Sequence, residues 1–175
     1  MLDLIIKNGK CYVDEQLKDV NIGVKDGKIQ KIGQITEDAK DTIDATGLIV
    51  LPGCMDTQTH FREPGSTDTE DLHSGSRAAI VGGITSVFEM PNTNPPTSTK
   101  KEFQRKLDLA KNRMYCNYAF YFGATADNAN ELADLKNLEG CCGIKLFAGS
   151  STGNLLVADE LSLIHISEPT RPYWI

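Results

Sequence analysis

Three polar side chains follow one another at every second position near residue 60 of the chain: Gln58, His60 and Arg62. On a β-strand, residues two apart face the same side. Histidine is a common metal ligand, whereas glutamine offers only a weak neutral oxygen. The guanidinium of Arg62 has the planar fork that suits a carboxylate. The spacing favours a metal site beside an anion-binding group, although a histidine packed in a core would show the same pattern.

A second group of polar side chains lies between prolines. Asn92 and Asn94 stand in the stretch from Met90 to Pro96. Their amides can donate and accept hydrogen bonds, and a loop stiffened by proline loses less entropy when it binds a ligand. The same composition is also typical of an ordinary turn, so this stretch alone supports both interpretations.

Lys145 stands inside the apolar segment 143–147. A buried lysine is costly unless it is paired or chemically altered, and burial lowers its pKa. A neutral amine can react with carbon dioxide to give a carbamate, which could bridge two metal ions. The alternative is a strand-end lysine that reaches for solvent. The neighbouring segment 149–153 is rich in Gly, Ser and Thr, but it lacks the Gly-Lys-Ser/Thr order of a P-loop.

The elements that must position these residues differ between two parts of the chain. Residues 1–51 predict a small antiparallel sheet, with short alternating strands and an Asp26-Gly27 hairpin turn. From residue 52 to residue 160 strands alternate with helices, which predicts a parallel sheet. Strands are expected at residues 54–61, 84–90, 118–122 and 142–147, and helices at residues 67–83, 99–114 and 129–138.

In such a sheet, polar residues at the carboxyl ends of strands are where chemistry is placed. Four places qualify: the stretch from Asp56 to Arg62, Glu89 with the two asparagines, the Asp127-Asn128 pair, and Lys145. The first helix is expected to open with a capping box at Thr67 and Glu70.

Composition narrows the class of partner. The 175 residues carry a formal net charge of -6, which argues against nucleic acid as a partner. No apolar run approaches the ~20 residues that span a bilayer, and the start lacks signal-peptide character. The five cysteines are an odd number without a Cys-x-x-Cys pair, as expected for reduced thiols in a cytoplasmic protein.

The last fifteen residues, 161–175, differ from the rest. They contain the only tryptophan and two of the seven prolines. The run from Leu161 to Arg171 resembles the translation of an adaptor used in DNA sequencing libraries. We therefore expect residues 161–175 to be a non-native tail and leave His165 out of the site.

Taken together, the stretches 52–65, 75–83, 90–95 and 143–147 resemble dihydroorotase and, more broadly, the cyclic amidohydrolases, which include allantoinase and hydantoinase. The His-Phe-Arg-Glu-Pro-Gly and Met-Pro-Asn-Thr-Asn-Pro strings are specific, and the resemblance covers residues 1 to about 160. It implies an α/β fold: the first half of a (β/α)8 TIM barrel, preceded by strands of a small β-sandwich. About four βα units are present against eight in ~250 residues of a closed barrel, so the chain is expected to be truncated.

The resemblance also assigns roles. His60 would bind zinc, carbamylated Lys145 would bridge, and Arg62 with Asn92 would hold the substrate carboxylate. A zinc-activated hydroxide would attack the ring amide, interconverting L-dihydroorotate and N-carbamoyl-L-aspartate in pyrimidine biosynthesis. Gln58 stands where the family usually has a histidine, so one or two zinc ions are expected, the second with a poor ligand. The general-base aspartate is expected beyond residue 160.

Two other functions stay open. One is an allantoinase- or hydantoinase-type cyclic amidase. The other is a non-catalytic homologue that serves as a structural partner of aspartate carbamoyltransferase, which the glutamine at position 58 favours. The intact protein is expected to form a homo-oligomer. The chain of 175 residues is expected to be inactive and prone to aggregate, because half a barrel leaves open sheet edges and uncovered apolar surface.

Overall fold

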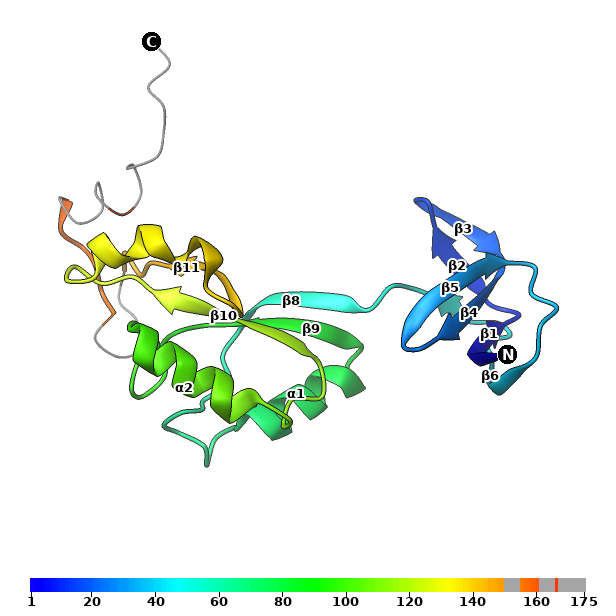
Figure 1. Cartoon of the computed structure of the whole chain (residues 1–175), viewed down its shortest axis with the longest axis horizontal. Helices are drawn as coiled ribbons and strands as arrows, with labels where there is room; N and C mark the ends of the chain where they lie inside the picture. The colour runs from blue at the N-terminus through cyan, green and yellow to red at the C-terminus, as the bar shows by residue number, and fades with distance from the viewer. Residues whose placement is uncertain (150–154, 161–165, 167–175) are drawn as a thin grey trace, which may run out of the picture. The chain divides into compact units, whose positions relative to one another are not determined.

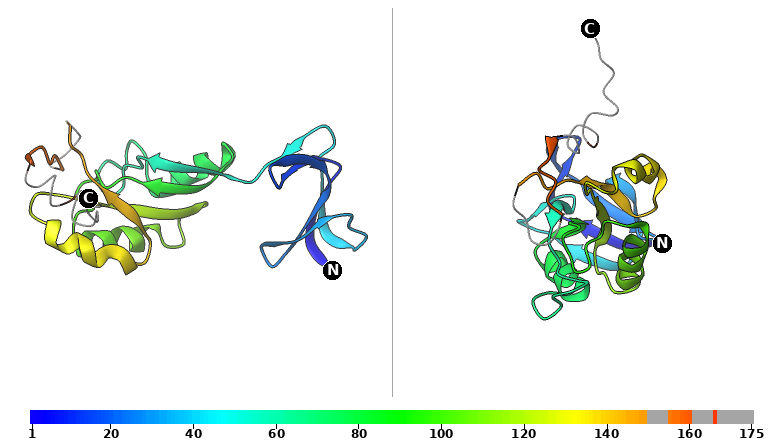
Figure 2. Two further views of the ribbon diagram at one scale, coloured as in Figure 1. Left: turned by 90° about the horizontal axis from the view of Figure 1, so that it is seen from above. Right: turned by 90° about the vertical axis from the view of Figure 1, so that its left-hand side faces the viewer.

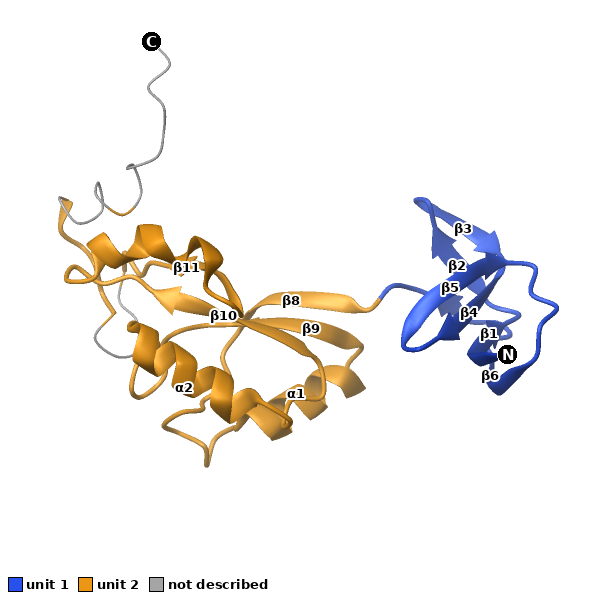
Figure 3. Cartoon of the chain, in the orientation of Figure 1, with its two compact units in different colours: residues 1–52 blue, residues 53–175 orange. Residues whose placement is uncertain are grey.

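The computed structural model describes residues 1–149, 155–160 and 166, which form two compact units, Met1–Pro52 and Gly53–Ile175 (Figure 3). Most of the Gly/Ser/Thr segment at 149–153 and of the adaptor-like tail at 161–175 lies outside the described residues. Ile166 is described, and it packs half-buried against the core of the second unit.

The first unit is built from two small sheets (Figure 1). One has the strand order β5-β4-β1-β6 and the other the order β3-β2-β7. The strands are β1 (Leu2–Lys7), β2 (Lys10–Val13), β3 (Gln16–Asp19), β4 (Asn21–Lys25), β5 (Lys28–Gly33), β6 (Ala39–Asp44) and β7 (Ile49–Val50).

The predicted hairpin at Asp26-Gly27 is confirmed, because both residues have positive φ, 51° and 70°, and β4 pairs antiparallel with β5. The expectation of a purely antiparallel sheet is wrong. β6 pairs parallel with β1, and β7 pairs parallel with β2. Residues 34–38 carry the chain from β5 to the opposite edge of its sheet, where β6 runs in the direction of β1.

The second unit contains one sheet of four parallel strands in the order β11-β10-β9-β8. Its elements are β8 (Cys54–Thr59), α1 (Leu72–Val81), β9 (Ile84–Glu89), α2 (Lys100–Ala110), β10 (Asn117–Gly123), the 3-10 helix η1 (Ala129–Asn137) and β11 (Cys141–Lys145). The predicted alternation of strands and helices is confirmed, and each new strand lies beside the one before it, as in half of a barrel (Figure 2).

The start of α1 differs from the prediction. The N-cap is Asp71, whose side chain accepts a hydrogen bond from the backbone N–H of Ser74 at 2.6 Å. Thr67 and Glu70 precede the helix, in a segment of turns. A carboxylate anchors the first turn, because Glu63 accepts a hydrogen bond from the backbone N–H of Leu72 at 2.9 Å. The capping pattern was therefore present, but one turn further along the chain.

The other predicted helix starts are confirmed, but α2 ends at Ala110 instead of residue 114, and the third helix is the 3-10 helix η1. Thr99 caps α2 by accepting from the backbone N–H of Glu102 at 3.2 Å, and α1 ends at Gly82. One core joins the helices to the sheet. Its buried residues are Phe61, Leu72, Val87, Phe103, Ala110, Cys116, Phe120, Phe122, Ala124, Leu132 and Leu135. Among the described residues, no helix combines the length and apolar character needed to cross a bilayer.

Candidate functional site

The sequence-predicted site residues gather at one edge of the parallel sheet. His60 and Arg62 directly follow β8, Asn92 follows β9, and Lys145 ends β11. Because all four strands run in the same direction, their carboxyl ends meet at this edge. In open and closed α/β folds this is the edge that carries ligand sites.

The loops after β8 and β9 contact each other directly. Nδ1 of His60 lies 2.9 Å from Oδ1 of Asn92. Further along, the backbone N–H of Asn94 donates to the carbonyl oxygen of Pro64 at 2.9 Å. Gly65 adopts φ 121°, and a Cβ at this position would lie 2.8 Å from the Cβ of Asn94. Only glycine fits this close approach, so the two motifs form one docked pair of loops.

The same edge is tied together across the remaining strands. The backbone N–H of Thr97 donates to the carbonyl oxygen of Pro91 at 2.9 Å, and its own carbonyl accepts from Gly123 at 2.8 Å. The N–H of Ala124 then donates to the carbonyl oxygen of Lys145 at 2.9 Å. A continuous set of backbone hydrogen bonds therefore fixes all four strand ends relative to one another.

Strand register shows which face of the sheet Lys145 occupies. Phe120 and Phe122 of β10 are fully buried in the core beneath the helices. Tyr121 and Gly123 alternate with them and lie on the opposite face, and Gly123 is the register partner of Lys145. Lys145 therefore lies on the face turned away from the helices. In a closed barrel that face is the interior.

The surroundings of Lys145 are less apolar than the sequence predicts. The side chain is half-buried, and Nζ lies 5.1 Å from the centre of the Phe147 ring, a cation–π contact. Within the described residues it forms no ion pair.

Gln58 does not reach the pair of His60 and Asn92 through any hydrogen bond among the described residues. Its side chain is exposed, and its backbone N–H donates to the Asp56 carboxylate at 2.9 Å. The register of β8 against β9 is irregular between Asp56 and Thr59.

Arg62 is half-buried at the same edge, and its backbone N–H donates to the carbonyl oxygen of Glu70 at 3.1 Å. Its charge acts on Glu89. Burial raises the pKa of Glu89 to about 8, while the charges of Lys106 and Arg62 oppose that rise. The guanidinium forms no side-chain hydrogen bond or ion pair within the part of the chain described here.

Glu89 was predicted as an edge residue, but its side chain turns into the core. It is 1% exposed and forms an ion pair with Lys106 of α2, which is 0% exposed. Sequence reasoning missed Lys106. The available signal was its position three residues after Phe103, on the apolar face of the helix.

Asn128 proves to be part of the scaffold. Its Oδ1 accepts from the backbone N–H of Thr125 at 2.8 Å. Its Nδ2 donates to the carbonyl oxygens of Ser98 and Gly123, both at 2.9 Å. The amide thus ties the loop after β10 to the start of α2, and the Asp127-Asn128 stretch is explained by turn chemistry.

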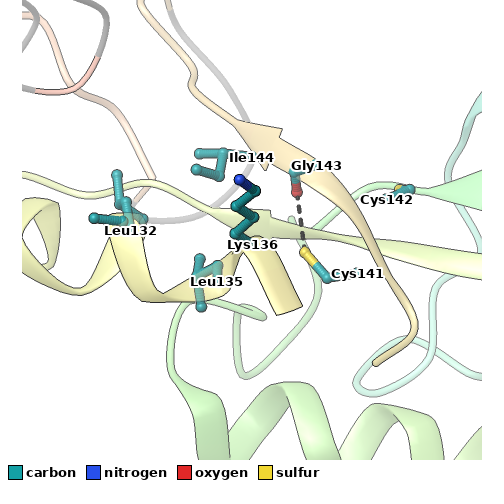
Figure 4. A pocket seen from close by; sticks show the side chains of 8 residues that line it. Leu132, Leu135, Lys136, Cys141, Cys142, Gly143 and Ile144 are labelled. Carbon is teal, nitrogen blue, oxygen red and sulfur yellow. Dashed lines mark hydrogen bonds between the residues drawn. The ribbon is translucent and has the colours of Figure 1, made fainter. Parts of the chain in front are cut away.

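A separate cavity of about 300 Å³ lies between η1 and β11 (Figure 4). Its lining residues are Leu132, Ala133, Leu135, Lys136, Cys141, Cys142, Gly143 and Ile144. Burial raises the pKa of the Cys142 thiol to about 12, so this thiol stays protonated and is a poor nucleophile. The cavity contains none of the residues at the carboxyl edge, and we assign it no catalytic role.

Residues 49–149 match the Amidohydrolase family, and the chain belongs to it. It is 42% identical over 149 residues to an allantoinase of Escherichia coli O1:K1, covering 85% of this chain and 33% of that protein. An allantoinase of Salmonella choleraesuis is 41% identical over the same length. The chain thus spans about a third of the length of these curated relatives.

Solved structures agree with this assignment. The L-hydantoinase (dihydropyrimidinase) from Arthrobacter aurescens superimposes with a TM-score of 0.85 at 32% identity, covering 95% of this chain and 38% of that one. The D-hydantoinase from a Thermus species gives 0.70 at 26% identity, covering 91% and 36%. The resemblance to cyclic amidohydrolases is confirmed, but these relatives do not single out dihydroorotase.

Members of this family are generally metal-dependent, commonly with zinc. His60 fits such a role, because Asn92 Oδ1 can only accept a hydrogen bond, so Nδ1 carries the proton and Nε2 keeps its lone pair for a metal. No group of three His, Cys, Asp or Glu side chains gathers among the described residues.

Proposed function

We propose that this chain is the N-terminal part of an enzyme that hydrolyses an amide bond in a cyclic ureide ring, with allantoin or hydantoin rings as the first candidates. The observation that carries the proposal is the docked pair His60–Asn92 at the carboxyl edge of a hydantoinase-like half-barrel. Allantoinases 41–42% identical over 149 residues support the ring class. We use "full-length enzyme" below for a polypeptide of these relatives' length that contains the described residues.

The proposed site divides the work among three residues. His60 and carbamylated Lys145 hold zinc, and Asn92 keeps the imidazole of His60 in the ligating tautomer. When bound, zinc supplies Lewis acidity toward the ring carbonyl and toward water. Water adds across the ring C–N bond, the carbonyl carbon becomes a carboxylate, and the departing nitrogen takes a proton. Catalytic acid–base groups outside residues 1–160 complete the site.

Dihydroorotate is the second candidate substrate, and Arg62 is the observation that favours it. This ring carries a carboxylate, and the half-buried guanidinium at the same edge can bind one. Asn92 is predicted to donate to that carboxylate through Nδ2, because its Oδ1 is engaged by His60. Allantoin and the parent hydantoin ring are neutral and make no such demand on Arg62.

The test is a side-by-side assay of the full-length enzyme, loaded with zinc, on allantoin, hydantoin and dihydroorotate. Hydrolysis of one or both of the first two supports the main proposal, and a preference for dihydroorotate supports the second candidate. Failure on all three by a folded, zinc-loaded protein would contradict both and favour a non-catalytic homologue. In that case binding to aspartate carbamoyltransferase would be the next measurement.

A further inference from the structure

A lysine is fully buried beneath the candidate site. Lys106 lies on the face of α2 that also carries Phe103 and Ala110, both without exposed surface. Its Nζ pairs with Glu89, donates to the carbonyl oxygen of Met90 at 3.0 Å and lies 5.1 Å from the ring centre of Phe120. Leucine at this position would complete the apolar face, so the charge needs an explanation.

Stability alone does not supply that explanation. The desolvation of two buried charges often exceeds their attraction, and apolar replacements of such pairs are often neutral or stabilising. Burial lowers the pKa of Lys106 and raises that of Glu89, in each case against the attraction of the partner. The charged groups that act on Glu89 are Lys106 from α2 and Arg62 from the loop after β8. The pair therefore carries a cost that a simple core contact would avoid.

The position of the pair connects it to the site. Glu89 is the last residue of β9, and Met90 and Pro91 alone separate it from Asn92. Met90 is held from two sides, because its carbonyl accepts from Lys106 and its N–H donates to the carbonyl oxygen of Thr59 at 2.9 Å. Thr59 directly precedes His60. One residue, Met90, therefore sets the path of the chain toward both members of the hydrogen-bonded pair.

Pro91 carries this constraint onward. Proline fixes its own φ and has no backbone N–H, so it passes on the orientation set at Met90 with one fewer free torsion. Its carbonyl accepts from the N–H groups of Thr93 and Thr97, both at 2.9 Å. The segment from Glu89 to Asn92 is consequently held by Lys106 at its start and by backbone hydrogen bonds at its end.

We propose that Lys106, paired with Glu89, is a positioning residue that fixes the exit of β9 so that Asn92 Oδ1 meets Nδ1 of His60. An effect of Lys106 on catalysis rests on the proposed function, whereas its effect on the contact between Asn92 and His60 does not. Lys106 touches neither substrate nor metal in this account. It acts through Met90 and Asn92 on the tautomer and orientation of one imidazole.

The decisive variant is Glu89→Leu combined with Lys106→Met in the full-length enzyme, which removes both charges, leaves no unpaired charge and takes the side-chain donor from the carbonyl oxygen of Met90. We expect a melting temperature equal to or above that of the wild type, with kcat lowered about 10-fold or more, because small misplacements near a reacting centre are expensive. The matched control is Lys101→Met, an exposed lysine on the same helix, which should change neither quantity.

A readout independent of activity is the ¹⁵N–¹H signal of the His60 Nδ1–H group, assigned by its absence in His60→Gln. It should be slow to exchange in the wild type and in Lys101→Met, and lost or fast-exchanging in the double variant. If the enzyme opens no ring but this signal behaves as stated, the proposed function fails and the positioning role stands. A folded double variant with wild-type kcat and an unchanged His60 signal would overturn the role.

A second pair of substitutions tests the proposal if the first double variant does not fold. Glu89→Gln with Lys106→Gln removes the charges and keeps an N–H donor for the carbonyl oxygen of Met90. We expect this amide pair to fold and to retain the His60 signal. Loss of the signal in the folded amide pair would show that the hydrogen bond to Met90 is not what positions Asn92, and would contradict the proposal.

Discussion

Nδ1 of His60 lies 2.9 Å from Oδ1 of Asn92, so side chains from two different strand ends meet in one hydrogen bond. The two residues are 32 positions apart in the chain. Neither strand end reaches the other by local structure alone. The contact depends on the parallel pairing of β8 with β9 and on the close approach of Gly65 to Asn94.

This hydrogen bond predicts different behaviour for two substitutions of Asn92. Asn92→Ala removes the acceptor that holds the His60 tautomer, and zinc affinity of the full-length enzyme should fall about 10- to 100-fold. Asn92→Asp keeps an acceptor oxygen and should retain most of the affinity. Zinc titration against a competing chelator measures both. Equal affinities for the alanine variant and the wild type would show that the contact does not orient the ligand.

Lys145→Ala removes the proposed carbamate and should abolish hydrolysis and reduce the zinc content. Lys136→Ala is the control, because Lys136 is exposed on η1 and lies outside the carboxyl edge. Metal analysis of the purified proteins, together with the ring-opening assay, checks the prediction. Full activity in Lys145→Ala would rule out the bridging role.

Arg62→Met should discriminate between substrates by their charge. If the guanidinium binds a substrate carboxylate, the KM for dihydroorotate should rise about 10-fold or more, as expected for the loss of a charge-assisted hydrogen bond. The KM for hydantoin, which has no carboxylate, should change little. Steady-state kinetics on both rings measure the difference, and an equal effect on the two would show that Arg62 does not select for charge.

Glu63 is predicted to matter for stability. Arg113 contacts it through two hydrogen bonds, of 2.7 and 3.1 Å, and these raise the pKa of Arg113. Glu63 also accepts the backbone N–H of Leu72 at the start of α1. Glu63→Ala should lower the free energy of unfolding by about 1–3 kcal/mol, measured by urea denaturation.

The matched control for that experiment is the more exposed pair Glu102–Arg105 on α2, with an N–O distance of 3.3 Å. Surface pairs of this kind contribute about 0.2–1 kcal/mol. Glu102→Ala should therefore change stability much less than Glu63→Ala. Similar losses in the two variants would indicate that Glu63 contributes no more than an ordinary surface charge.

Glu89 predicts a pH dependence of stability. Its pKa rises from an ordinary 4.5 to about 8 on folding because the carboxyl is buried. Folding therefore takes up a proton between these values, and the contribution of Glu89 to stability falls as the pH rises through the window. The variant Glu89→Gln has no carboxyl group at this position and cannot take up this proton on folding. Its free energy of unfolding, relative to the wild type, should increase from about pH 5 to about pH 8.

Urea denaturation of both proteins at several pH values within this window measures the difference. Lys106 contributes to the difference with the same sign. In Glu89→Gln it loses the carboxylate that raises its pKa, so the pKa of Lys106 falls further. Holding Lys106 protonated then costs the folded variant more stability at low pH. A constant difference between the variant and the wild type across the window would contradict the assignment of Glu89 as a buried carboxyl with a raised pKa.

Much of the second unit could be predicted from the sequence. Its parallel strands are short β-rich stretches bounded by Gly or Pro, and Thr99 caps α2 as expected. In the first unit the sequence located only the Asp26-Gly27 hairpin, and the strands β2, β3 and β6 are mostly exposed. A strand that buries few side chains leaves little hydrophobic period to detect.

The position of the candidate residues at one sheet edge was predictable, but their contacts were not. His60, Arg62, Asn92 and Lys145 do lie at one edge, because strand direction alone brings carboxyl ends together. The partner of His60 and the inward turn of Glu89 were not predictable. Both depend on register and on packing against α2, which a pattern of residue types along one strand does not encode.

The most direct test of the central claim is the rate at which zinc-loaded full-length enzyme opens allantoin and hydantoin, compared with the variant His60→Ala. Our account predicts ring opening by the wild type, with formation of a ureido carboxylate, and a loss of about 100-fold or more in the variant, on the scale expected when a zinc ligand that orients the reacting carbonyl is removed. A folded, zinc-loaded wild type that leaves both rings intact, or a His60→Ala variant with undiminished activity, would contradict it.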